Sequence, residues 1–442
     1  MSQAVKEKSI YADAFRKFAA RASEGQPAWV ARLREGAFAR FEELGFPTTD
    51  EEDWKYTNVA SIARAEFMPA EGSTKLESGA VENFASAEAK RSCLVFVDGV
   101  FRRELSSLEA LAEGVVAEDL SVALAGEHAE LLWEHLGRLS GEGSDAFSAL
   151  NTAFLGGGAL LYAPKGVEAG APVQLLFVST AEAGAATFPR VLVVAERDSR
   201  LDVIETYAST GEGTYLTDAV VEVFVGEGAR VSHYKVQDEG ANAFHVASTR
   251  AELSRSSSYD LTTVTLGAQL SRHNIEVLLE SEGAECRIDG LYIVGTGQHT
   301  DTHSLIDHRV ANCASRQNYK GILDGRSRAV FNGRVFVRED AHGTDAEQSN
   351  KNLLLSREAR VDTKPQLEIY NDDVKCSHGA TVGQLDEDEL FYLISRGLHT
   401  DLARNLLTYG FAEEIVGKIK FESIRAQLDE AILNRLHARL EV

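Results

Sequence analysis

The stretch VFVGEGARVSHYKV, residues 223–236, shows the pattern that runs through the central half of the chain. An apolar run ends in a tight turn of glycine and glutamate, a small residue follows, and apolar and polar residues then alternate. Alternation with a period of two is typical of a strand that buries one face, and glycines are typical of sharp turns. The stretch therefore predicts two short strands joined by a tight corner.

The same pattern recurs through residues 170–385. The copies are VVAERDSRLDVIETY (193–207), LLESEGAECRIDGLY (278–292), ILDGRSRAVFNGRVFV (322–337) and LLLSREARVDTKPQLEIY (353–370), with a weaker copy LSRSSSYDLTTV (253–264). The small residues after the turns are Ser199, Ala229, Ala284, Ser327 and Ala359, a recurrence of roughly 27 to 32 residues with one longer gap. Such self-similarity indicates stacked repeats, each burying its inward face on its neighbours. We expect a parallel β-helix; a β-sandwich, which needs no such regular turn, is the alternative.

Helical patterns precede the repeats. In AWVARLREGAFARFEELG, residues 28–45, Trp29, Leu33, Ala37 and Phe41 recur at helical spacing, and Gly45 is the expected stop. Further on, CLVFVDGVFRREL (93–105) predicts a hairpin that turns at Asp98-Gly99. We therefore divide the chain into an N-terminal helical region (1–90), a mixed α/β lead-in (91–165), the β-helix (166–385) and a C-terminal helical domain (386–442).

Charge and composition exclude several classes of protein. Acidic residues outnumber basic ones by 68 to 45, and the resulting net charge of -23 repels nucleic acid and anionic lipid. No apolar run approaches the ~18 residues that a membrane-spanning helix needs. The four cysteines form no CxxC pair, and the first 25 residues lack the apolar core of a secretory signal. We expect reduced thiols in a cytoplasmic protein.

A run of three glycines, residues 156–158, invites comparison with phosphate-binding loops. The stretch FSALNTAFLGGGALLYAPKGV (147–167) lacks the GK[ST] ending of a Walker motif, because its lysine follows a strand and a proline. The sequence contains neither a complete Walker motif nor GxGxxG. ATP hydrolysis by this chain is therefore not expected.

Cys376 and His378 are the candidate ligands, in NDDVKCSHGATVG (371–383). On a strand, residues two apart point to the same face, so the thiol and the imidazole can converge on one atom. Thiolate and imidazole suit iron–sulfur, zinc or copper ligation, but two ligands fall short of the usual four. The alternative is a strand with one buried thiol. The adjacent acids Asp372 and Asp373 face opposite ways and cannot flank one glycosidic bond.

After Leu385 the pattern changes to amphipathic helices, beginning with DEDELFYLISRGL (386–398). Its acids suit a helix N-terminus, and Leu390, Leu393 and Ile394 share one face. These helices would either cap the end of the β-helix or present a docking surface for another subunit, and both roles are compatible.

Four stretches resemble the SufD branch of the SufB/SufD family, scaffold subunits of the Suf iron–sulfur cluster assembly system. They are GFPTTDEEDWKYTNV (45–59), ALNTAFLGGGALLYAPKGV (149–167), TDAEQSNKNLLLS (344–356) and KPQLEIYNDDVKCSHGATVGQLDEDELFYLISRGL (364–398). They occur in the order of the family and cover essentially the whole chain. The Cys-rich N-terminal motif of SufB is absent from the sequence.

The resemblance implies a right-handed parallel β-helix between helical domains, and a scaffold that is not itself an enzyme. It implies pairing with SufB through the β-helix, with His378 and Cys376 as iron or cluster ligands at that interface. It also implies docking of the SufC ATPase on the C-terminal helices, for which the candidate residues are Leu390, Leu393, Ile394, Leu406, Leu407 and Phe411. A transient iron–sulfur cluster or iron is expected there rather than a tightly bound cofactor, and a homodimer is possible in isolation. The alternatives are a β-helix enzyme acting on carbohydrate and a SufB-like self-pairing scaffold.

Overall fold

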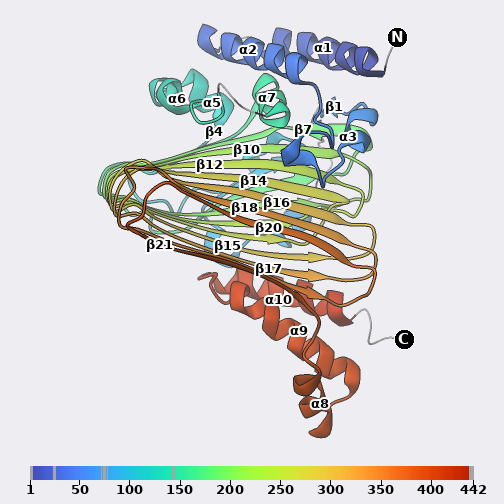
Figure 1. Ribbon diagram of the computed structural model, residues 1–442. Helices are drawn as coiled ribbons and strands as arrows, with labels where there is room; N and C mark the ends of the chain where they lie inside the picture. The colour runs from blue at the N-terminus through green and yellow to red at the C-terminus, as the bar shows by residue number, and fades with distance from the viewer. Residues whose placement is uncertain are drawn as a thin grey trace.

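The computed structural model describes residues 3–22, 26–70, 72, 76, 78–141 and 145–437. Its core is a parallel β-helix, in which the chain alternates between two sheets and each new strand pairs in parallel with the one before it in the same sheet. Figure 1 shows the strands stacked between N-terminal helices on one side and C-terminal helices on the other. The expected mainly β architecture with helices at both ends is confirmed.

Sheet I and sheet II are the two walls of the β-helix. Sheet I has the order β20 (Arg360–Ile369), β18 (Arg328–Val337), β16 (His299–His308), β14 (Leu270–Leu279), β12 (Phe244–Leu253), β10 (Leu216–Val225), β8 (Pro189–Ala195), β5 (Gly157–Ala163) and β4 (Val116–Asp119), with β7 (Ala185–Thr187) and β1 (Met68–Pro69) beside it. Sheet II has the order β21 (Val374–Gly383), β19 (Thr344–Leu354), β17 (Ala314–Leu323), β15 (Glu285–Val294), β13 (Ser258–Thr265), β11 (Arg230–Asp238), β9 (Arg200–Ser209), β6 (Val173–Ser179), β2 (Cys93–Val97) and β3 (Val100–Phe101).

The recurring small residues occupy buried corners, but of two kinds. Ser199, Ala229 and Ala284 precede strands of sheet II, whereas Ser327 and Ala359 precede strands of sheet I. The longer gap in the repeat is therefore a change from one kind of corner to the other. Cys313 is buried at the corner before β17, which makes it a further small corner residue of sheet II. The sequence pattern did not include it because it was defined by alanine and serine.

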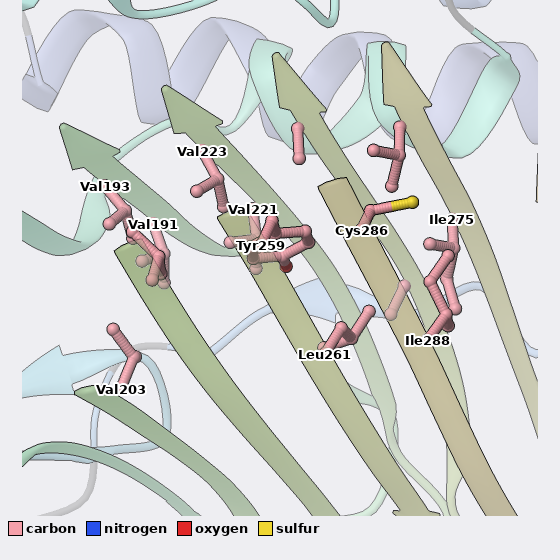
Figure 2. Close-up of a cluster of buried hydrophobic side chains, with 14 of the residues drawn as sticks. Val191, Val193, Val203, Val221, Val223, Tyr259, Leu261, Ile275, Cys286 and Ile288 are labelled. Carbon is pink, nitrogen blue, oxygen red and sulfur yellow. The ribbon is translucent and has the colours of Figure 1, made fainter. Parts of the chain in front are cut away.

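Apolar side chains fill the inside of the first turns. Figure 2 shows valines of β8 and β10 facing Leu261, Ile288 and the thiol of Cys286 across the interior. Cys286, Cys313 and Cys93 are all buried, as expected for small apolar residues, and burial raises the pKa of the Cys93 thiol to about 12. These three thiols act as packing groups rather than ligands.

The N-terminal helices cover the outer face of sheet I. They are α1 (Gln3–Ala22), α2 (Ala28–Leu44), η1 (Glu52–Trp54) and α3 (Ala60–Arg64), and they pack with α7 (Ala146–Ala153). Helix α2 ends at Gly45 as predicted, but its most buried residues are Val30, Arg34, Phe38 and Phe41, one position away from most of the predicted stripe. Trp29, Leu33 and Ala37 are partly buried and also pack against the core, so the predicted stripe lies at the edge of the buried face. The buried Arg34 donates its Nε–H to the Leu155 carbonyl at 2.8 Å.

Residues 78–135 lie between the N-terminal helices and the regular turns, at the end of the β-helix where β3 and β4 terminate the two sheets. Its short elements are α4 (Ser78–Glu82), η2 (Ala87–Ala89), η3 (Arg103–Leu105), α5 (Leu120–Ala125) and α6 (Ala129–His135). The hairpin β2–β3 is present, with Asp98 at φ 47° and Gly99 at φ 78° in its turn. The glycine run allows two backbone segments to approach closely. A Cβ at Gly158 would lie 1.8 Å from the carbonyl oxygen of Arg190, its register partner on β8.

The C-terminal helices turn back along the β-helix instead of capping its end. Helices α9 (Thr400–Val416) and α10 (Glu422–His437) pack on the outer face of sheet II, with Ile415, Ile419 and Ile424 buried against strands such as β15. Helix α8 (Glu387–Ser395) projects away from the strands, as Figure 1 shows. The cap interpretation is therefore wrong, because the apolar face of α9 and α10 matches the side of the β-helix.

Candidate functional site at the open end of the β-helix

The last turn of the β-helix is left open. Strands β20 and β21 end their sheets, so each is paired along one edge only within the described chain. At the opposite end, sheet II finishes in the two-residue β3 and sheet I in the four-residue β4, both antiparallel, and α5 packs over β4 and β5. Long unpaired edges are rare in monomeric proteins, because they invite pairing with another chain. The open end thus exposes two long strand edges that are unpaired within the described residues.

Cys376 and His378 both lie on β21 at this end. Their register partners on β19 are Ala346 and Gln348, which are buried, whereas the intervening Glu347 is exposed. Side chains alternate across a strand, so Cys376 and His378 continue the inward-facing row. The strand spacing predicted this shared face. Because no further turn covers them, Cys376 is only half-buried and His378 is exposed.

The two candidate ligands differ in whether they must lose a proton before they can bind a metal. Partial burial raises the pKa of the Cys376 thiol, and the nearby Asp345 carboxylate raises it further. The thiol is therefore held protonated in the isolated chain, whereas metals bind the thiolate. A histidine binds metal through a neutral ring nitrogen and needs no such deprotonation.

Within the described residues, no group of three or more His, Cys, Asp or Glu side chains could hold a metal ion. Cys376 and His378 are therefore at most half of a ligand set, since iron–sulfur and zinc sites generally have four protein ligands. Because both face the open end, the missing ligands would have to come from a chain that pairs with it.

A second exposed surface lies on α8 and the first half of α9, here called the arm. The side chain of Asp386 caps α8 by accepting from the backbone N–H groups of Asp388 and Glu389, at 2.8 and 3.0 Å. Helix α8 buries none of its residues and contacts α9. Large apolar side chains are consequently left in solvent on the arm: Phe391 (72% exposed), Tyr392, Ile394, Leu402 and Leu406.

The comparisons with known proteins agree with this arrangement. A family model described as "SUF system FeS cluster assembly, SufBD core domain" matches residues 177–411, and one described as "SufBD protein N-terminal region" matches residues 5–175. The chain belongs to the SufBD family. The core-domain match spans most of the β-helix and reaches into α9, so it includes both the open end and the arm.

Relatives of this SufBD-family chain match along most of their length. A SufBD family protein of Synechocystis is 36% identical over 412 residues, covering 91% of this chain and 90% of the relative. The iron–sulfur cluster assembly protein SufD of Escherichia coli is 31% identical over 397 residues, covering 89% and 90%. SufD of Bacillus subtilis is 29% identical over 420 residues, covering 92% and 94%. The SufBD family resemblance of the sequence is therefore confirmed.

The candidate docking residues of this SufBD chain are not equally accessible. Ile394 and Leu406 are exposed, whereas Leu390, Leu393 and Leu407 are partly buried. Phe411 is also partly buried and supports the fold, because the Lys320 ammonium lies 4.3 Å from its ring centre. Phe391, Tyr392 and Leu402 are further exposed apolar residues on the arm that the sequence analysis did not name. Phe391 lies three residues before Ile394 and Leu402 four residues before Leu406, a spacing that places each pair on one helix face.

Ion pairs fasten the C-terminal end of α9 and the linker after it to sheet II. Lys320 pairs with Glu414, and Lys418 reaches the buried Asp289 carboxylate at 2.6 Å. Lys420 bonds Asp202 at 2.6 Å. These contacts hold the C-terminal end of α9 against the β-helix. None of the described helices is long and apolar enough to cross a bilayer.

Proposed function

We propose that this chain is the SufD-type scaffold subunit of an iron–sulfur cluster assembly complex. In this proposal it pairs with SufB through the open end of the β-helix, docks the SufC ATPase on the arm, and contributes His378 to the site where the cluster is built. The observation that carries the proposal is the position of His378, facing inward on the uncovered edge strand of a SufBD-family chain.

Pairing with SufB is supported by the surface at the open end. Two strands of ten residues, β20 and β21, offer backbone hydrogen bonds to an added strand. Ile369, Tyr370 and Val382 are exposed there and would be covered by the partner. Edge pairing combined with burial of such side chains is the usual way in which sheets associate across chains.

Docking of SufC is supported by the arm. Its apolar side chains have no partner within the β-helix, and an amphipathic helix that presents its apolar face fits a groove on another protein. The sequence lacks a Walker motif, so in this proposal the ATP is hydrolysed by SufC and this chain is not an enzyme by itself. Closing of the SufC subunits would pull on the arm and rearrange the SufB interface.

Iron and sulfide are the substrates of this site. His378 would ligate iron through a neutral ring nitrogen, while Cys376 would join only if a neighbouring cation or metal lowers its thiol pKa, which partial burial now raises. The histidine is therefore the ligand on which assembly depends more strongly. In the absence of SufB, the same open edges would allow a second copy of this chain to pair.

The proposal is tested by reconstitution with SufB and SufC. Native mass spectrometry is expected to give a complex containing all three proteins, and iron and sulfide supplied with ATP are expected to give cluster absorbance. Replacing His378 by Ala should leave the complex mass unchanged and greatly reduce cluster formation. Undiminished assembly with His378→Ala would remove the ligand role, and failure to recruit SufB would remove the scaffold assignment.

A further inference from the structure

From β13 to β19, the inward positions of sheet II change from largely apolar to polar, whereas earlier turns already bury ionisable side chains such as Glu205 and His233. The inward positions of β13 and β15 hold residues such as Leu261 and Ile288. Two turns later, the inward positions of β19 hold Gln348, Asn350 and Asn352, all buried. Burying amides is unfavourable unless they are hydrogen-bonded, so this change requires an explanation.

One column of these polar groups leads directly to His378. Ile288, Gln317, Gln348 and His378 are register partners on successive strands of sheet II. The Gln317 Nε2 donates to the Ser304 hydroxyl at 2.7 Å, and the Gln348 Nε2 donates to the Gln317 Oε1 at 2.7 Å. The Gln348 amide therefore donates away from the open end, while Gln317 donates to Ser304 on β16 of sheet I.

The last buried amide of the column, that of Gln348, has an acceptor oxygen without a hydrogen-bond partner in the described part of the chain. The Oε1 of Gln348 is buried and has no hydrogen-bond partner among the described residues. A buried acceptor without a hydrogen-bond partner destabilises the fold. The space for this amide is built in: a Cβ at Gly333 would lie 2.4 Å from the Gln348 Nε2.

The other inward-facing amides of β19, on Asn350 and Asn352, have no such unpaired acceptor. The Asn352 Nδ2 donates to the Asn350 Oδ1 at 2.6 Å, and the Tyr292 hydroxyl donates to the Asn352 Oδ1 at 2.5 Å. The Asn350 Oδ1 also accepts from Thr363 at 2.8 Å. These polar groups are hydrogen-bonded to one another, so their burial needs no ligand to account for it. The Gln348 Oε1, in contrast, has no hydrogen-bond partner among the described residues.

We propose that Gln348 is the positioning residue of His378. Adjacent strands lie about 4.8 Å apart, and the Gln348 side chain already spans this distance to Gln317. The His378 imidazole, one strand further on, can therefore reach the Gln348 Oε1 by side-chain rotation. A ring N–H donated to this oxygen fixes the tautomer and leaves the other nitrogen unprotonated and directed to the open end. Histidines that bind metals commonly donate their second ring nitrogen in this way.

Tautomer selection by Gln348 is independent of cluster assembly, whereas its consequence for iron binding rests on the proposed function. The first test therefore uses the chain without partners. Protein labelled with ¹⁵N-histidine is studied by NMR at pH 8, and His378→Ala assigns the His378 signals among the twelve histidines. One neutral tautomer is expected for His378 in the unsubstituted chain, and an even mixture of the two would overturn the inference at once.

Three variants sharpen this test. Gln348→Leu removes the acceptor and should give mixed tautomers at His378, whereas Gln348→Glu keeps an oxygen there and should retain one tautomer. Asn352→Leu is the matched control, since it removes an inward-facing amide from the same strand four residues from Gln348. The remaining histidine signals report whether each variant is folded. An unchanged His378 spectrum in folded Gln348→Leu would contradict the proposal, as would an equal change in Asn352→Leu.

Iron binding by the complex with SufB provides the second readout. Gln348→Leu is expected to weaken iron binding about 10–100-fold, the usual effect of losing a hydrogen-bond partner of a metal ligand, with Gln348→Glu restoring most of it. If His378→Ala leaves cluster assembly intact, the proposed function fails whatever the NMR result. If His378→Ala abolishes assembly but Gln348→Leu changes neither the tautomer nor iron binding, the positioning role alone is overturned.

Discussion

Arg272 and Asp301 are register partners on β14 and β16 and form a buried ion pair, with 2.7 Å between Nη1 and Oδ2. The Arg272 guanidinium lies 3.8 Å from the Trp54 ring centre and also donates to the Asp53 carbonyl at 2.8 Å. Thr57 donates to the Asp301 carboxylate. The pair therefore ties the segment 52–57 to the outer face of sheet I.

We predict that Asp301→Ala destabilises the protein by about 3–5 kcal/mol, because it leaves the Arg272 charge buried without its partner. Urea unfolding measures this change, and limited proteolysis should show faster cleavage around residues 52–57. Asp362→Ala is the matched control, since Asp362 pairs with Arg328 at 2.9 Å where both side chains are well exposed, and should cost at most about 1 kcal/mol. Equal costs for the two variants would contradict the role given to burial.

Stability is predicted to fall between pH 6.5 and 4 because of His308. Burial lowers the pKa of His308 to about 4, although the Asp307 charge opposes the shift. In this range the unfolded chain binds a proton at this residue and the folded chain does not. The free energy of unfolding therefore decreases as the pH falls, by up to about 1.4 kcal/mol per pH unit from this histidine.

The measurement is urea unfolding at several pH values from 7 to 5. His308→Gln should flatten the dependence, while His342→Gln, at an exposed position, should leave it unchanged. The same slope in His308→Gln as in the unsubstituted protein would show that other groups, such as the buried His245 and His273, account for the loss.

The β-helix could be predicted from the sequence because each turn repeats the same local chemistry, a small corner residue followed by alternation. The shared face of Cys376 and His378 followed from strand geometry in the same way. The position of α9 and α10 could not be predicted, because an amphipathic helix fits the side of a β-helix as well as its end. The Gln317–Gln348 column was also missed, since polar residues on a strand are ordinarily read as solvent-facing; only the register shows that they are inside.

The arm is predicted to bind SufC through its exposed apolar side chains. Replacing Phe391 and Leu406 by Asp should weaken SufC binding at least tenfold, because both side chains would lose an apolar environment in the complex. Since they are exposed in this chain, the melting temperature should change little. Isothermal titration calorimetry with SufC provides the measurement.

Leu433→Asp is the control for the arm, as Leu433 is 37% exposed on α10, outside the arm. It should bind SufC like the unsubstituted chain. Full affinity in the Phe391→Asp, Leu406→Asp variant would place the SufC contact elsewhere. Loss of affinity in all three positions would indicate a general disturbance of the C-terminal helices rather than a defined surface.

The open end is predicted to lose its partner when its apolar edge is charged. Ile369→Lys with Val382→Lys adds two ammonium groups to strands whose other sides remain fully paired, so the fold should be retained. Pairing with SufB, or with a second copy, would then bury these charges without counterions, which is strongly unfavourable. Val122→Lys is the control, because Val122 is 53% exposed on α5 at the closed end. Sedimentation velocity should show the open-end variant as a monomer in the presence of SufB, with the control still forming the complex; a complex with both would mean that SufB binds another face.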